Sequence, residues 1–134
     1  MAMVVDASAL GLAVLGRSPT HRSLRLRLAG EVCHAPHLID AEIGSVLRRR
    51  VLRGELPPAV GEALLLVATP LIDHRHEITA GLAQAAWTLR DKLSFYDALY
   101  VALAQALAIP LLTADLRLSR AVALPCAVEV AQTV

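Results

Sequence analysis

The chain has 134 residues, of which 56% are hydrophobic and 19% charged, and its formal net charge is +1. This length is enough for one domain with a core that needs no disulfides, and no stretch of about 18 uncharged apolar residues is present, which excludes a membrane-spanning helix. The first residues carry no basic leader and no signal peptide, so we expect a cytoplasmic protein.

Metal-binding cysteine and histidine patterns are also missing. The two cysteines, Cys33 and Cys126, lie in apolar segments and are expected to be free thiols. No cysteine or histidine pair has the spacing of a structural zinc site. The run from His74 to His76 is interpreted as an exposed loop.

The first third of the chain alternates short apolar runs with a helix signal. Residues 3–5 and residues 31–35 are predicted to be buried strands. Between them, Ser18 and Pro19 have the residue types that begin helices, and Gly30 is a typical helix end.

The same alternation continues to the end of the chain. A helix is predicted over 37–53, ended by Gly54, and Pro57 with Pro58 begins another helix that runs to residue 68. The remaining predicted elements, in chain order, are a strand at 71–73, helices at 79–93 and 94–107, a strand at 111–113, a short helix at 115–121 and a strand at 127–130.

Continuous apolar strands that alternate with helices indicate a parallel sheet covered on both faces. No linker, internal repeat or low-complexity segment interrupts the pattern. We therefore predict one α/β domain over residues 1–134, with a central parallel sheet of four to five short strands flanked by helices on both faces. Ligands of such sheets bind beyond the carboxyl ends of the strands.

Four acidic side chains interrupt or end apolar runs: Asp6, Glu42, Asp97 and Asp115. Asp6 and Asp115 follow strands, Asp97 opens the helix that leads to residues 111–113, and Glu42 lies in the first turns of the helix after the second strand. All four map to the same rim of the sheet. A charge removed from water is costly unless it is paired, so we expect the four carboxylates to share a divalent metal.

Each acid also has a purely structural interpretation. Asp6 and Asp115 are suitable helix or turn caps, and Asp97 matches a capping box that begins at Ser94. Glu42 is harder to explain in this way, because its helical neighbours at i−3, i+1 and i+4 are apolar. Four unrelated caps are not expected to share one rim, so the sequence favours a joint site.

The segments that carry a family resemblance are 4–10, 40–43, 93–104 and 111–115. In this order they resemble the PIN-domain ribonucleases, and specifically the VapC-type toxins of prokaryotic toxin–antitoxin pairs. The run Tyr-Asp-Ala-Leu-Tyr-Val-Ala-Leu-Ala that begins at Tyr96 is specific for this resemblance. The similarity extends over essentially the whole chain.

The resemblance implies a metal-dependent endoribonuclease that uses Mg²⁺ or Mn²⁺. The four acids of the family fall on Asp6, Glu42, Asp97 and Asp115. The hydroxyl groups near the metal correspond to Ser8 and Thr113. Some members have a further acid at the position that Arg117 occupies here, so the resemblance does not decide between one and two metals.

The resemblance also implies partners: an RNA substrate, a VapB-like antitoxin whose carboxyl-terminal segment covers the groove, and a second copy of the chain. Four basic residues are candidates for RNA contacts: Arg49, Arg50, Arg53 and Arg117. Arginines in this position usually form a solvated helix face, and contact with phosphate is the minority interpretation for those after Glu42. Part of the dimer surface is expected at 57–68, through Val60, Leu64, Leu65 and Val67, although these side chains suit the core as well.

Two other functions are compatible with a domain of this kind. A receiver-like phosphoacceptor domain requires a lysine at the end of a late strand, and the only lysine here, Lys92, lies in a predicted helix. A non-catalytic module that binds RNA or antitoxin requires no cleavage, and the basic residue at Arg117 keeps this alternative open. Metal-dependent cleavage of RNA distinguishes the enzyme from the module.

Overall fold

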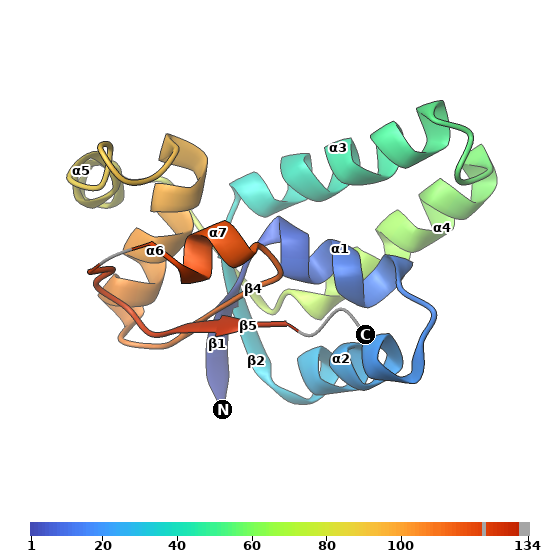
Figure 1. Cartoon of the computed structure of the whole chain (residues 1–134), viewed down its shortest axis with the longest axis horizontal. Coiled ribbons are helices and arrows are strands. Elements are labelled where there is room, and N and C mark those ends of the chain that lie inside the picture. The colour runs from blue at the N-terminus through green and yellow to red at the C-terminus, as the bar shows by residue number, and fades with distance from the viewer. Residues whose placement is uncertain (122, 132–134) are drawn as a thin grey trace.

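The structure, a computed structural model, describes residues 1–121 and 123–131 and contains one sheet of five parallel strands (Figure 1). The strands are β1 (Ala2–Val5), β2 (Val32–Pro36), β3 (His74–His76), β4 (Leu111–Thr113) and β5 (Val128–Val130). The α-helices are α1 (Ala7–Leu15), α2 (Pro19–Gly30), α3 (Leu38–Leu52), α4 (Pro58–Ala68), α5 (Ala80–Trp87), α6 (Phe95–Leu107) and α7 (Leu116–Ser119). The predicted α/β architecture is confirmed; the domain was predicted over 1–134, and residues 122 and 132–134 of it lie outside the described residues.

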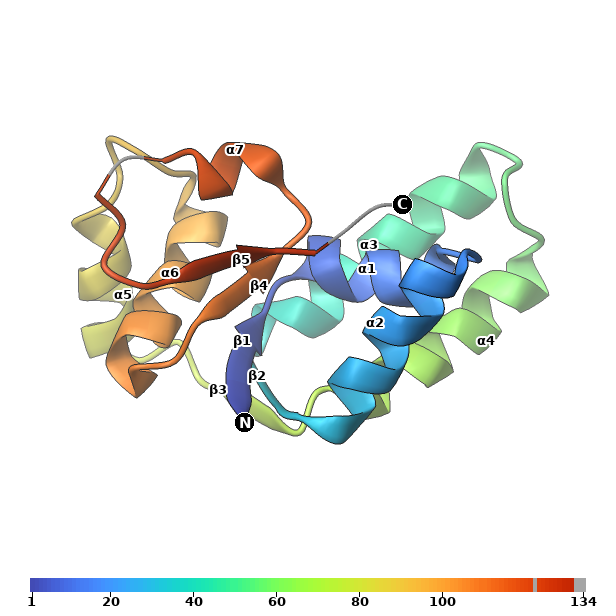
Figure 2. The same ribbon diagram turned by 60° about the horizontal axis from the view of Figure 1, so that its bottom comes forward.

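The sheet separates two groups of helices. Helices α1 to α4 lie on one side of it, and α5 and α6 lie on the other (Figures 1 and 2). Strands β1 and β4 are apolar without alternation because helices cover both of their faces, and Val4, Val5 and Leu111 are completely buried. On the α6 side, every residue from Ala98 to Ala104 is buried.

Helix α1 was not predicted from the sequence. Six of its nine residues are buried, because the helix packs between the sheet and the neighbouring helices α2, α3 and α4. A helix enclosed on several sides has no polar face, so it lacks the 3.6-residue pattern by which a surface helix is detected. The sequence Ala-Ser-Ala-Leu-Gly-Leu-Ala-Val-Leu therefore carries no periodic signal.

Two other predictions were wrong in their limits. The strand predicted at 71–73 lies instead at His74–His76, after a short 3₁₀ turn at Thr69–Leu71, and it pairs with β2 as an edge strand. This result also corrects the interpretation of residues 74–76 as a loop. The helix predicted over 79–93 ends at Trp87. In contrast, α3 ends before Gly54 as predicted, and this glycine has the positive φ of 75° that favours glycine.

Both cysteines are free thiols, as predicted. Burial raises the pKa of the Cys33 thiol to about 11, so this group stays protonated at neutral pH. Among residues 1–121 and 123–131, no helix has the length and apolar character needed to cross a bilayer.

Three histidines on β2 and β3 form a cluster. The Nδ1 atom of His34 lies 2.9 Å from Nε2 of His76, and the rings of His34 and His74 stack with centroids 4.8 Å apart. Burial lowers the pKa of His34 and of His76, and the neighbouring imidazoles lower it further, whereas Asp73 acts in the opposite direction on His34. The folded chain thus favours neutral imidazoles at these positions.

We expect this cluster to make the fold less stable in mild acid. Above pH of about 6.5 the imidazoles are neutral in both the folded and the unfolded chain. As the pH falls from there through the lowered folded-state pKa values, the unfolded chain takes up protons first and the folded state loses relative stability. The Tm measured without metal at pH 7.5 and pH 5.5 should therefore fall more for the natural chain than for a His34→Gln/His76→Gln double variant. If Tm falls equally in the two proteins, protonation of His34 and His76 is not what destabilises the fold, since the carboxyl groups are the same in both.

Candidate active site

The strand order places a topological switch point between β1 and β4. From β1 the chain continues outward through β2 and β3, whereas β4 and β5 extend the sheet on the other side of β1. Asp6 directly follows β1, Thr113 is the last residue of β4, and Asp115 lies two residues further on. The carboxyl ends of these neighbouring strands form the crevice in which parallel sheets bind ligands.

Asp6 lies at this end of the sheet and is buried, with only 5% of the residue exposed. Its Oδ1 atom caps α1 by accepting a hydrogen bond from the Ala9 N–H at 2.9 Å, and it also accepts from Ser8 Oγ at 2.6 Å. The Thr113 hydroxyl donates to Oδ2. The structural interpretation of Asp6 as a cap is therefore correct, but the cap uses only part of the carboxylate.

Two hydroxyl groups connect the turn after β1 with the turn after β4. Ser8 Oγ lies 3.1 Å from Thr113 Oγ1 and accepts from the Ala114 N–H at 2.9 Å. Thr113 Oγ1 accepts from the Asp115 N–H at 3.0 Å. The two residues expected to supply hydroxyls thus both contact Asp6, and they hold the two strand ends together.

Glu42 lies near the start of α3, the helix that follows β2, and it reaches the same region. Its carboxylate is half-buried and accepts a hydrogen bond of 2.7 Å from the hydroxyl of Tyr100 on α6. Tyr100 was not among the predicted site residues. One feature of the sequence could have indicated Tyr100: it is a tyrosine in an otherwise apolar helix. The hydroxyl of a buried tyrosine needs a hydrogen-bond partner.

Asp97 and Asp115 are carried by the amino ends of α6 and α7. Ser94 caps α6 by accepting from the Asp97 N–H at 3.2 Å, so the carboxylate of Asp97 is not used by the cap. Asp115 caps α7, and its carboxylate also accepts from Arg117, with Nη2 at 3.0 Å and Nε at 3.2 Å. Arg117 thereby lowers the pKa of Asp115.

The pKa of each of the other three carboxylates is raised. Burial is the largest cause for Asp6, Glu42 and Asp97, and the charge of Asp97 adds to the effect on both Asp6 and Glu42. The charge of Asp115 acts in the same way on Asp97. Asp97 therefore interacts with the charge of each of the other three acids. Within the described ranges, only Asp115 of the four forms a salt bridge.

The donor set matches a hard divalent cation. Carboxylate and hydroxyl oxygens are the ligands that Mg²⁺ and Mn²⁺ prefer, and three neighbouring carboxylates without a cationic partner need a counter-charge. In the part of the chain that the structure describes, no three acid, histidine or cysteine side chains are placed so that they could together hold one metal ion. Two carboxylates are directed elsewhere, Glu42 to Tyr100 and Asp115 to Arg117.

A cation held by Asp115 would have to compete with Arg117 for this carboxylate. The Arg117 side chain is 90% exposed, so replacing it costs little packing. We expect Arg117→Gln to tighten Mn²⁺ binding by up to about fivefold, the range of an exposed ion pair. Calorimetric titration of Mn²⁺ into the chain without RNA measures this change, with Arg120→Gln as control. Unchanged affinity shows that Arg117 already leaves Asp115 free in solution.

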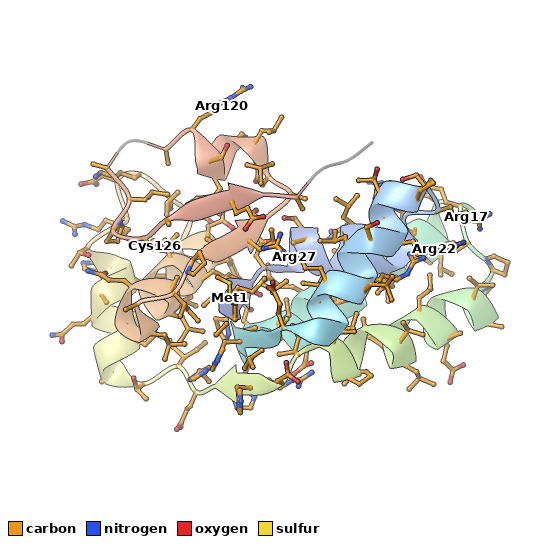
Figure 3. All side chains as sticks on the ribbon, turned by 90° about the horizontal axis from the view of Figure 1, so that it is seen from below. Met1, Arg17, Arg22, Arg27, Arg120 and Cys126 are labelled. Atoms are coloured by element: carbon orange, nitrogen blue, oxygen red, sulfur yellow. The ribbon has the colours of Figure 1, made fainter. Side chains whose placement is uncertain are left out.

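The arginines expected to contact RNA are distributed unevenly. Arg49 lines a hollow together with Glu42, whereas Arg50 lines one that includes Ser8 and forms a salt bridge of 3.2 Å with Glu55. Arg53 caps the far end of α3, eleven residues after Glu42. In Figure 3, Arg22 and Arg27 project from α2, Arg17 lies just before this helix, and Arg120 lies away from them beyond α7.

Comparison with known proteins identifies the family. The PIN domain family matches residues 3–124. Ribonuclease VapC1 of Mycobacterium tuberculosis is 45% identical over 126 residues, which cover 94% of this chain and 95% of the relative.

Two solved structures are similar in fold. The structure of VapBC2 from Rickettsia felis bound to a promoter DNA fragment has a TM-score of 0.71 at 13% identity and covers 96% of this chain and 98% of that one. VapC20 of Mycobacterium tuberculosis, a sarcin–ricin loop cleaving toxin, has a TM-score of 0.66 at 19% identity, with coverages of 87% and 92%. With its parallel sheet and the acids at the switch point, the chain belongs to the PIN domain family and, within it, to the VapC ribonucleases.

Proposed function

We propose that this chain is the ribonuclease toxin of a VapB–VapC pair and hydrolyses RNA at the site formed by Asp6, Glu42, Asp97 and Asp115. The observation that carries this proposal is the buried carboxylate of Asp6, which has acids as neighbours and hydroxyl groups, not a cation, as partners. Burying such a charge is costly, and the cost is offset when a dication is bound. The 45% identical relative is itself a ribonuclease.

The side chains of the site have distinct tasks in this proposal. Asp6, Asp97 and Asp115 hold Mg²⁺ or Mn²⁺, and Glu42 binds it directly or through water. When bound, the metal supplies an activated water and offsets charge on the phosphate that is cleaved. Ser8 and Thr113 fix the orientation of the Asp6 carboxylate through their hydrogen bonds.

Tyr100 has a positioning task in the same proposal. It fixes the Glu42 carboxylate at 2.7 Å. Burial and the neighbouring Glu42 raise the pKa of Tyr100, so its hydroxyl stays a hydrogen-bond donor at neutral pH. Glu42 is thereby held on the α6 side of the site, next to Asp97.

A VapB-like antitoxin is the expected protein partner, since similar folds include a VapBC assembly. A basic side chain of the antitoxin that enters the acidic site replaces the metal electrostatically, so inhibition and catalysis exclude each other. Both partners and the RNA are expected to meet in the cytoplasm.

A homodimer is also part of this proposal. In α4, Val60 and Val67 are exposed, whereas Leu64 and Leu65 pack partly against the core. Of the four residues predicted for the self-association surface, Val60 and Val67 are therefore the more accessible.

The test is incubation of the purified chain with RNA and Mg²⁺, Mn²⁺ or EDTA. We expect cleavage that requires the metal, leaves a 5′-phosphate and a 3′-hydroxyl, and stops when the cognate antitoxin is added. RNA that is retained without being cut supports the non-catalytic module instead. Cleavage that continues in EDTA contradicts a metal-dependent mechanism.

A further inference from the structure

A hollow of about 320 Å³ adjoins the acidic site on the side of α3 and α6. Its walls include Ala7 of α1, Tyr96 of α6, and Glu42, Ser45 and Arg49 of α3. The three α3 residues are spaced at i, i+3 and i+7, which places them on one helix face. The hollow therefore begins at an acid of the site and leads about 10 Å along α3 to a basic side chain.

Tyr96 has an unusual environment for a large aromatic residue in this chain. Its side chain is 61% exposed, although the tyrosine one helical turn later, Tyr100, is 1% exposed and hydrogen-bonded to Glu42. The next residue, Asp97, is one of the four acids. An exposed ring thus lines the same hollow as Glu42, one of the four acids.

The polar groups of the hollow are also available to a ligand. Neither the guanidinium of Arg49 nor the hydroxyl of Ser45 is engaged in a side-chain hydrogen bond or salt bridge within residues 1–121 and 123–131. Arg49 provides the charge that a phosphate requires, and Ser45 is able to donate to or accept from a base edge. A flat ring, a free guanidinium and a hydroxyl match one nucleotide of single-stranded RNA.

We propose that this hollow binds one nucleotide next to the cleaved phosphate, with its base stacked on Tyr96 and its phosphate at Arg49. The inference rests on the proposed ribonuclease function and adds a residue that determines how the RNA is held. It favours RNA over a segment of the antitoxin, because Arg49 repels the basic side chain expected to enter the acidic site. Tyr96 is in this view a specificity residue and takes no part in the chemistry.

The experiment measures binding and cleavage separately. Fluorescence anisotropy in EDTA gives the affinity for a short single-stranded RNA of defined sequence, and for a set of copies in which one nucleotide at a time is abasic. The proteins are the natural chain, Tyr96→Ala, Tyr96→Phe, and Trp87→Ala as a control that removes an aromatic residue of the same 61% exposure outside the hollow. Steady-state cleavage with Mn²⁺ is then measured for the same four proteins.

Stacking of one base predicts that Tyr96→Ala weakens RNA binding by roughly five- to 150-fold. Tyr96→Phe and Trp87→Ala should bind like the natural chain, and the penalty of Tyr96→Ala should disappear with one of the abasic RNAs. In cleavage, KM should rise while kcat changes little. Equal penalties for intact and abasic RNA, no RNA binding by the natural chain, or loss of antitoxin binding alone overturn the inference. Base-dependent binding without any metal-dependent cleavage supports the subsite and rejects the ribonuclease function, so the two failures are distinct.

Discussion

Replacing Asp6 by asparagine is expected to lower RNA cleavage on the order of 10²- to 10³-fold while the fold persists, because the metal loses a charged ligand that supplies several kcal/mol of charge stabilisation. The amide retains the shape of the carboxylate. Its oxygen accepts from Ala9 N–H and Ser8 Oγ as Asp6 does, and its nitrogen donates to Thr113 Oγ1. Cleavage rates at saturating Mn²⁺ and thermal melts of the same preparations measure both parts of the prediction.

Two further variants separate chemistry from folding. Asp6→Ala also removes the charge, but it loses the cap of α1, worth about 1 kcal/mol, and leaves the buried Thr113 hydroxyl without its acceptor, worth about 1–3 kcal/mol. It should therefore be less stable than Asp6→Asn by about 2–4 kcal/mol. Asp91→Asn, at an exposed position, should cleave like the natural chain. Metal-dependent cleavage by Asp6→Asn at the natural rate would falsify the assignment of this site.

Replacing Asp97 by asparagine is expected to stabilise the metal-free fold and to remove most of its stabilisation by Mg²⁺. Burial raises the pKa of Asp97, and the charge of Asp115 raises it further. Between the ordinary carboxyl pKa and this raised value, the folded state holds more protons than the unfolded state. Stability is therefore lost as the pH rises through this window, and the full loss is present at neutral pH. The asparagine side chain does not ionise, so the Asp97→Asn variant does not lose this stability as the pH rises.

The effect of metal has the opposite sign. At 100 times its Kd, Mg²⁺ that binds only the folded state stabilises the natural chain by about 2.7 kcal/mol. Asp97→Asn weakens this binding, so its melting temperature should change much less when Mg²⁺ is added, and its cleavage rate should fall at least about 100-fold. Denaturant unfolding at pH 7.5, with EDTA and with Mg²⁺, tests both effects. A metal-free variant that is less stable than the natural chain contradicts the proposed repulsion.

Several elements were predictable because their signals are local. Pro58 and Gly54 stand at helix limits, the run Leu111–Thr113 is an apolar strand, and the alternation of strands and helices leads to a parallel sheet. Helix α1 was missed since burial on several sides removes the periodic pattern. The limits of β3 were wrong because hydrogen bonding to β2, not apolar character, decides which residues form this edge strand.

The placement of each acid after a strand or near the start of a helix was likewise predictable, since each follows or opens an element whose direction in a parallel sheet is known. The distant partners of Asp6 and Glu42 were not. Tyr100 and Glu42 are 58 residues apart, and Thr113 and Asp6 are 107 apart, so no local pattern joins them. The sequence by itself determined which side chains carry negative charge to the end of the sheet, because chain direction and residue type are local properties. Only the tertiary structure decided that the Thr113 hydroxyl holds Asp6 and that a tyrosine holds Glu42, because those contacts depend on how distant segments pack.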